Sequence, residues 1–161
     1  MEKVIGESVK KTNRLFVKSY TEDYCKAITE NYREYHIRTL KGNLHGNYPE
    51  YARQQLDEIE NGTANLMKFE IREGKKYYKI VQMEYDRVWK NGIIDDSNIV
   101  YEYREGSVHA FVDKNTGDVF KPASWKAPAK HVRFTFQKPE DIRFLLTPRN
   151  VDWAGGYLYM R

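Results

Sequence analysis

Apolar positions recur at helical spacing through the first sixty residues of the chain. The clearest stripe covers residues 21–41, where Thr21 can act as an N-cap and Gly42 follows the last turn. Its apolar face carries one residue per turn: Tyr24, Ile28, Tyr32, His36 and Leu40. A weaker pattern of the same period covers residues 3–19, and Pro49 suits the first position of a helix that stops at Asn61-Gly62. The sequence therefore predicts two helices or more in this region.

The period changes to two after residue 66. Alternation predicts strands over residues 67–71 and 99–103, and a run rich in β-branched and aromatic residues predicts a strand over 77–85. Turn residues separate these runs: Glu73-Gly74-Lys75 follows the first, and Asn91-Gly92 marks a hairpin tip after the second. Glu105-Gly106 is expected to turn into the next hairpin.

A central hairpin is predicted over residues 107–121. Ser107–Asp113 alternates, Lys114–Gly117 supplies turn residues, and Asp118–Lys121 returns as the second strand. Pro122 ends the pairing because it lacks a backbone donor. A further strand is expected over residues 132–136, a short helix over 139–146 and a last strand over 157–160.

These elements predict an α+β fold, with N-terminal helices packed on one face of a curved antiparallel sheet. Short connections favour a meander of about five to six strands. A length of 161 residues suits one domain, mainly helical over residues 1–64 and mainly antiparallel β over 65–161.

Two motifs in the second half are specific in length and composition. Residues 111–134 read FVDKNTGDVFKPASWKAPAKHVRF, and the chain ends in DWAGGYLYMR. Both motifs resemble those of a family of small proteins associated with tailed-bacteriophage genomes, whose members carry a FVDKxTGxVYKPASWKxPAK-like run. The resemblance covers roughly residues 66–161, apart from an insertion-like run over 86–106. It implies a phage origin and brings no catalytic residues with it.

Composition and charge limit the expected cellular location of the protein and the kind of partner that it can bind. The net charge is +4 with a pI near 9.0, which favours anionic partners and argues against a DNA mimic. Cys25 is the single cysteine, so an internal disulfide is excluded. The first residues lack the apolar run of a signal peptide, and no stretch reaches the length of a membrane span. With the phage resemblance, we expect the host cytoplasm during infection, or the virion.

Local motifs for catalysis or metal binding are absent from the sequence. Cys25 and His36 share a predicted helix face but lie about 16 Å apart along it, too far to bind one ion. His45, His109 and His131 stand in separate elements without ligand spacing. No P-loop, GxSxG motif or paired-carboxylate motif is found. We therefore expect no metal, no cofactor and no enzymatic activity, with an enzyme lacking a recognisable motif as an alternative.

The segment from residue 114 to 138 combines basic and aromatic residues and is the strongest functional signal. Six cations stand there against one acid, Asp118, and four aromatic residues lie between them. The predicted binding residues are Lys121, Trp125, Lys126, Lys130, His131 and Arg133. Cations neutralise phosphates and exposed aromatic rings stack on unpaired bases, so nucleic-acid binding is one interpretation. The alternative for this segment is a structural strap that closes the end of the sheet.

Protein binding is the function that the sequence favours. Tyr, Trp and Arg dominate protein interfaces, and the chain has 13 Tyr and 3 Trp. We expect contacts with a host or phage protein that presents an anionic surface, either as an inhibitor of host defence or as a virion component. Trp153, within DWAGG, is expected to be structural and to pack against the sheet, with Gly155 and Gly156 shaping the backbone.

Overall fold

A computed structural model of the chain describes residues 2–89 and 96–160, except for the side chains of residues 2–12 and 96. Helix α1 (Glu2–Asn43) is followed by α2 (Pro49–Glu60) and by strands β1 (Lys68–Glu73) and β2 (Tyr77–Trp89). A 3₁₀ turn, η2 (Asp96–Asn98), precedes β3 (Ile99–Asp113), β4 (Asp118–Phe120) and β5 (Phe134–Thr135). The chain ends with α3 (Pro139–Leu145) and two 3₁₀ turns, η3 (Pro148–Asn150) and η4 (Gly156–Leu158). The predicted hairpin tip at Asn91-Gly92 lies outside the described residues.

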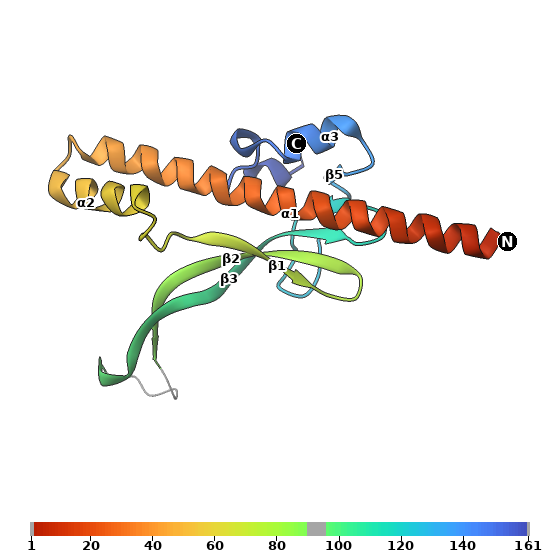
Figure 1. Cartoon of the computed structure of the whole chain (residues 1–161), viewed down its shortest axis with the longest axis horizontal. Helices are drawn as coiled ribbons and strands as arrows, with labels where there is room; N and C mark the ends of the chain where they lie inside the picture. The colour runs from red at the N-terminus through yellow and green to blue at the C-terminus, as the bar shows by residue number, and fades with distance from the viewer. Residues whose placement is uncertain (1, 90–95, 161) are drawn as a thin grey trace.

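The fold is α+β, as the sequence predicts. The five strands form one sheet in the order β1-β2-β3-β4-β5, and every neighbouring pair is antiparallel. Figure 1 shows α1 running across the sheet. The N-terminal end of the helix continues beyond the edge of the sheet. The central hairpin is confirmed, because Phe111 pairs with Phe120 and Val112 with Val119 around the predicted turn.

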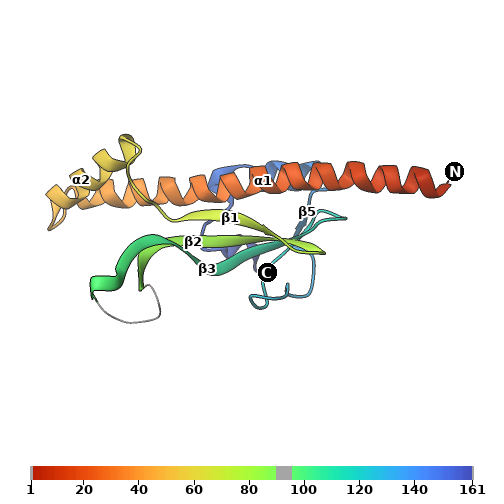
Figure 2. The same ribbon diagram turned by 60° about the horizontal axis from the view of Figure 1, so that its bottom comes forward.

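The core lies between α1 and one face of the sheet. Tyr24 and Ile28 of α1 are fully buried against Ile80, Ala110 and Val112 of the sheet. Figure 2 shows the loop of residues 121–129 on the opposite side of the sheet from α1. The two faces of the sheet are therefore covered by different parts of the chain, the helix on one and this loop on the other.

Helix α1 is continuous from Glu2 to Asn43, so the prediction of an N-cap at Thr21 was wrong. The Thr21 hydroxyl donates to the Val17 carbonyl at 2.6 Å, one turn back, and the side chain is completely buried. A threonine that bonds the carbonyl four residues earlier continues a helix instead of capping one. The sequence between 3 and 40 has no proline to interrupt the helix.

Strand β3 runs without a turn through Glu105-Gly106, where the sequence analysis placed one. The register between β2 and β3 shifts twice, between Ile80 and Val81 and between Val81 and Met83. Each shift gives β3 one more residue than β2, which defines a β-bulge. A Cβ on Gly106 would lie 3.2 Å from the Gln82 carbonyl oxygen, so glycine allows the close approach of the two strands. The glycine thus belongs to a bulge and not to a turn.

The last predicted strand, residues 157–160, was also wrong. The chain forms the turn η4 there, preceded by Gly155 in a left-handed conformation with φ 84°. The strand predicted over 132–136 is reduced to two residues, Phe134 and Thr135, because Pro122 ends the neighbouring strand and little of its edge remains to pair.

Gly117 closes the central hairpin against the helix. Its φ is 75°, and an added Cβ would lie 3.0 Å from Phe136 Cβ and 3.3 Å from Val17 Cγ2. We expect Gly117→Ala to lower the free energy of unfolding by about 1–2 kcal/mol, because a left-handed alanine is strained and its methyl group crowds the core. Urea denaturation checks this. Gly42→Ala is the matched control, since nothing lies within 4 Å of its Cβ position, and an equal loss there would contradict the prediction.

Candidate functional site

The predicted binding segment begins with a compact loop. Pro122 and Pro128 form an isolated antiparallel bridge, and the Ala129 amide donates to the Lys121 carbonyl at 2.7 Å. At the tip, the amides of Ala123 and Ser124 both donate to the Ala127 carbonyl. These bonds hold the ends of the loop together and present its tip from a defined frame.

Trp125 and Lys126, at the tip of this loop, lie over the face of the sheet that α1 leaves uncovered. The Lys79 ammonium group stands 4.6 Å from the centre of the Trp125 ring, which is a cation–π contact. Lys126 lines a hollow together with Lys79 and the β1–β2 turn. The structure therefore joins these two predicted residues to lysines that the sequence analysis did not single out.

Lys121 and Arg133 make intramolecular contacts instead. The Lys121 ammonium group lies 4.7 Å above the Tyr159 ring. The Arg133 guanidinium donates to the Leu158 carbonyl at 2.6 Å and to the carbonyls of Lys130 and His131 at 3.0 and 2.8 Å. Arg133 thus ties the backbone of residues 130–131 to the C-terminal turn, as a strap would.

Lys130 and His131 have exposed side chains in the same bend of the chain. His131 has a φ of 74°, the one positive value among the described residues other than glycine. The six predicted residues therefore divide between the sheet face at Trp125 and the C-terminal turn at Arg133.

A buried hydrogen-bond network joins three distant parts of the chain. The Tyr157 hydroxyl lies 2.5 Å from the Tyr24 hydroxyl of α1 and 2.7 Å from His109 Nε2 of β3. His109 stands at the first bulge of β3, where β2 has no matching residue. The Trp153 backbone beside the ring acts to raise the pKa of His109.

Burial shifts the pKa values of all three members of this network. Desolvation lowers the pKa of His109 to about 4, against smaller opposing effects of the Trp153 backbone and the Asp152 carboxylate. It raises the pKa values of Tyr24 and Tyr157 above their ordinary value of 10.0. The network is therefore uncharged at neutral pH.

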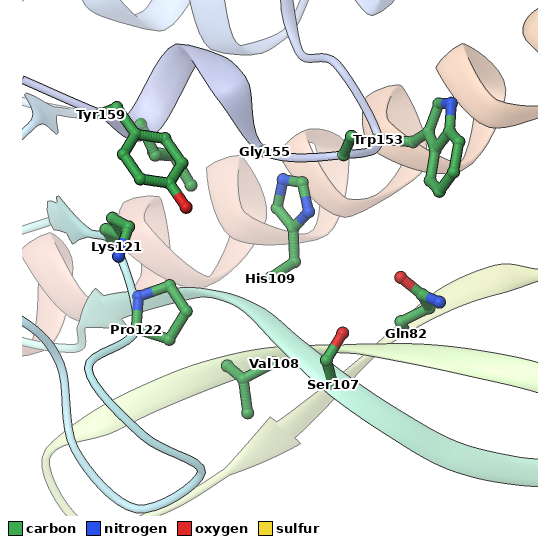
Figure 3. A pocket seen from close by; sticks show the side chains of 11 residues that line it. Gln82, Ser107, Val108, His109, Lys121, Pro122, Trp153, Gly155 and Tyr159 are labelled. Carbon is green, nitrogen blue, oxygen red and sulfur yellow. The ribbon is translucent and has the colours of Figure 1, made fainter.

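Next to this network is a pocket of about 340 Å³ between β3 and the C-terminal segment. Figure 3 shows His109 at its centre beneath Gly155, with Gln82 and Ser107 on one side and Tyr159 above Lys121 on the other. The bond from His109 Nε2 to the Tyr157 hydroxyl places the ring to hold the C-terminal segment against β3.

The Trp153 side chain packs on α1. Its ring centre lies 5.2 Å from that of Tyr32 and 5.3 Å from that of Tyr35, and its amide donates to Asn31 Oδ1. The sequence analysis placed this ring on the sheet, whereas these aromatic contacts are with the helix. The positive φ of Gly155 agrees with the expectation for the first glycine of the motif.

A second surface is an arm formed by β2 and β3, which sequence reasoning missed. Among the described residues, β2 beyond the Lys68–Met83 pair has no strand neighbour other than β3, and β3 pairs with β4 at Phe111 and Val112 only. Figure 1 shows this two-stranded arm curving away from α1. One face of the arm carries the pairs Tyr85–Tyr103, Arg87–Tyr101 and Trp89–Ile99. The alternation of Tyr85, Arg87 and Trp89 with Glu84, Asp86 and Val88 was the signal for this face.

The aromatic residues of the arm face remain open to solvent. Tyr101 is 61% exposed, and Tyr85 and Trp89 are 38% and 36% exposed. Tyr85 stacks on Tyr101 with ring centres 6.2 Å apart, while Tyr103 is anchored by a hydrogen bond from its hydroxyl to the Leu66 carbonyl. We call Tyr85, Arg87, Trp89 and Tyr101 the arm face.

Comparison with known families settles the classification. The model of a family of unknown function, DUF7717, matches residues 3–160. The chain belongs to this family. No curated protein and no solved structure matches the chain.

Within residues 2–89 and 96–160, no helix is long and apolar enough to cross a bilayer. The same residues contain no group of three or more His, Cys, Asp or Glu side chains placed to bind a metal.

Proposed function

We propose that this DUF7717 protein is a non-enzymatic binding protein that contacts another protein through the arm face. The observation that carries the proposal is the exposure of Tyr85, Trp89 and Tyr101 on a two-stranded arm. A two-stranded ribbon alone is marginally stable in water, and exposed aromatic rings on it gain stability when a partner covers them. Tyr, Trp and Arg are also the residues that contribute most to protein interfaces.

The arm face suits a partner with an apolar pocket bordered by hydrogen-bond acceptors. Tyr and Trp rings bury large areas at a low cost in conformational entropy, and Arg87 on the same face would donate to an anionic rim. Resemblance to tailed-phage proteins suggests where to look: an infected host cell, with a host-defence protein or a virion protein as partner. An enzymatic function is less well supported because the His109 ring beside the pocket is buried and bonded through Nε2 to the Tyr157 hydroxyl.

We expect Tyr85→Ser with Tyr101→Ser to weaken partner binding by at least about 30-fold, the effect of losing one interface hot spot of about 2 kcal/mol. Proteins captured from nuclease-treated lysate of infected cells by the wild type would be quantified by mass spectrometry. The captured protein with the highest enrichment would then be purified, and its affinity for the wild type and for each variant would be measured. Circular dichroism checks that the variant remains folded.

Tyr48→Ser with Tyr51→Ser is the matched control, because both tyrosines are exposed near the α1–α2 connection, away from the arm. Lys126→Glu with Lys130→Glu tests the alternative interface in the basic segment. A partner that binds the arm variant as tightly as the wild type, and is lost with the lysine variant, would refute the arm as the interface.

A further inference from the structure

The hollow that Lys126 lines has a volume of about 270 Å³ and lies at the β1–β2 turn. The turn contributes Lys75 and Lys76, β2 contributes Lys79, and the 121–129 loop contributes Lys126. The sequence separates Lys126 from the other three by about fifty positions, so only the fold brings them to one rim. We call these four residues the lysine rim.

The lysine rim has an excess of positive charge that the surrounding acids do not cancel. Glu73, which also borders the hollow, is paired with Lys114 at 3.1 Å. Arg72 is likewise paired, with Glu70 at 3.0 Å and Glu105 at 2.9 Å. Among the carboxylates of residues 13–89 and 97–160, none forms an ion pair with the four ammonium groups of the rim. An anion can therefore approach the rim without first displacing an internal carboxylate.

Aromatic rings line the same hollow and stand next to it. Tyr77 and Phe111 line it, with their ring centres 5.8 Å apart in an edge-to-face contact. Trp125 stands beside it, 40% exposed and held by the Lys79 ammonium group on its ring. The Pro122–Pro128 bridge fixes the loop that carries this indole. The lysine rim and the neighbouring Trp125 ring thus offer cations and an accessible aromatic side chain on a rigid frame.

We propose that the lysine rim and Trp125 bind single-stranded nucleic acid, a role independent of the arm face. Ammonium groups pair with backbone phosphates, and an exposed indole stacks on a base whose face is free. In a duplex the base faces are stacked internally, so the indole favours an unpaired strand. The hollow is smaller than the roughly 300–1,000 Å³ of pockets that enclose a small molecule, which fits a contact with part of a longer strand.

The test measures binding of a fluorescein-labelled dodecathymidylate to the full chain by anisotropy over a series of salt concentrations. Lys76→Glu with Lys126→Glu should weaken binding at least tenfold at low salt and reduce the slope of log affinity against log salt by about 1.4, for two lost phosphate contacts. Lys41→Glu with Lys138→Glu is the matched control, since these exposed lysines lie at the end of α1 and beside α3. Both variants change the net charge from +4 by the same four units, so a difference between them reports position and not overall charge.

Intrinsic fluorescence provides a readout that does not depend on charge. Quenching by the oligonucleotide should disappear in Trp125→Phe and persist in Trp89→Phe. Unlabelled duplex, thymidine monophosphate and pyrophosphate serve as competitors, and the single strand should compete best. Equal binding by the two charge variants, or no binding of the wild type at low salt, would overturn the proposal. If pyrophosphate competes better than the single strand, the hollow binds a small phosphate ligand, and the proposal of single-stranded nucleic-acid binding is refuted.

Discussion

Tyr157→Phe should lower the free energy of unfolding by about 2–4 kcal/mol. The Tyr157 hydroxyl bridges the Tyr24 hydroxyl and His109 Nε2, and Tyr24 and His109 are both buried. Removing the bridge leaves two buried polar groups without partners, and each such group costs about 1–3 kcal/mol. Urea denaturation, with an unchanged dependence of the unfolding free energy on urea, measures the loss.

Tyr24→Phe is the natural comparison for this variant. It removes a hydroxyl from the end of the network and leaves the bond between Tyr157 and His109 in place. A loss of about 1 kcal/mol is expected, close to the value of a single hydrogen bond. If Tyr157→Phe costs no more than Tyr24→Phe, the network does not hold the C-terminal segment in the way inferred from its geometry.

Acid should destabilise the protein through His109. Burial lowers the pKa of this histidine from 6.5 to about 4, so it stays neutral in the folded chain while its unfolded counterpart takes up a proton below pH 6.5. Between pH 6.5 and 4 the unfolded state binds more protons, and stability falls as the pH falls. The full contribution across this window is about 3 kcal/mol, from 1.36 kcal/mol for each unit of pKa shift.

Denaturation curves measured from pH 7 to pH 4 for wild type and His109→Gln isolate this contribution. The variant loses the titrating group, so its stability should decline less over the window by about the same 3 kcal/mol, whatever its stability at pH 7. His36, whose pKa burial also lowers, contributes in the same direction in both proteins. His45→Gln, at an exposed loop position, should keep the wild-type slope. Parallel slopes for wild type and His109→Gln would contradict the assignment.

The sequence predicts only some of the residues that form the candidate surfaces. Trp125 and Lys126 stood out because basic and aromatic residues are close together in that segment, and the fold places both beside further lysines. Arg133 belongs to the same segment by composition, yet its guanidinium bonds three carbonyls of its own chain. Composition does not indicate which cations face solvent, because that depends on the carbonyls that the fold brings to each of them.

The sequence by itself determined the features that arise from neighbouring residues. Helical spacing and Pro49 located α2, and alternation with the Asn115–Gly117 turn located the hairpin of β3 and β4. The α+β class and the antiparallel meander followed from the order and the short connections of these elements. Such signals are local because backbone geometry repeats every few residues.

The tertiary structure alone decided the continuity of α1, the bulges of β3 and the network of Tyr24, His109 and Tyr157. Thr21 reads as an N-cap from sequence, but within α1 it is buried and bonds back to the previous turn. The network joins positions 24, 109 and 157. These positions are far apart in the sequence, so no periodic pattern of residues predicts their contact. Packing supplies these contacts, and its free energy outweighs local preferences of a few tenths to about 1 kcal/mol per residue.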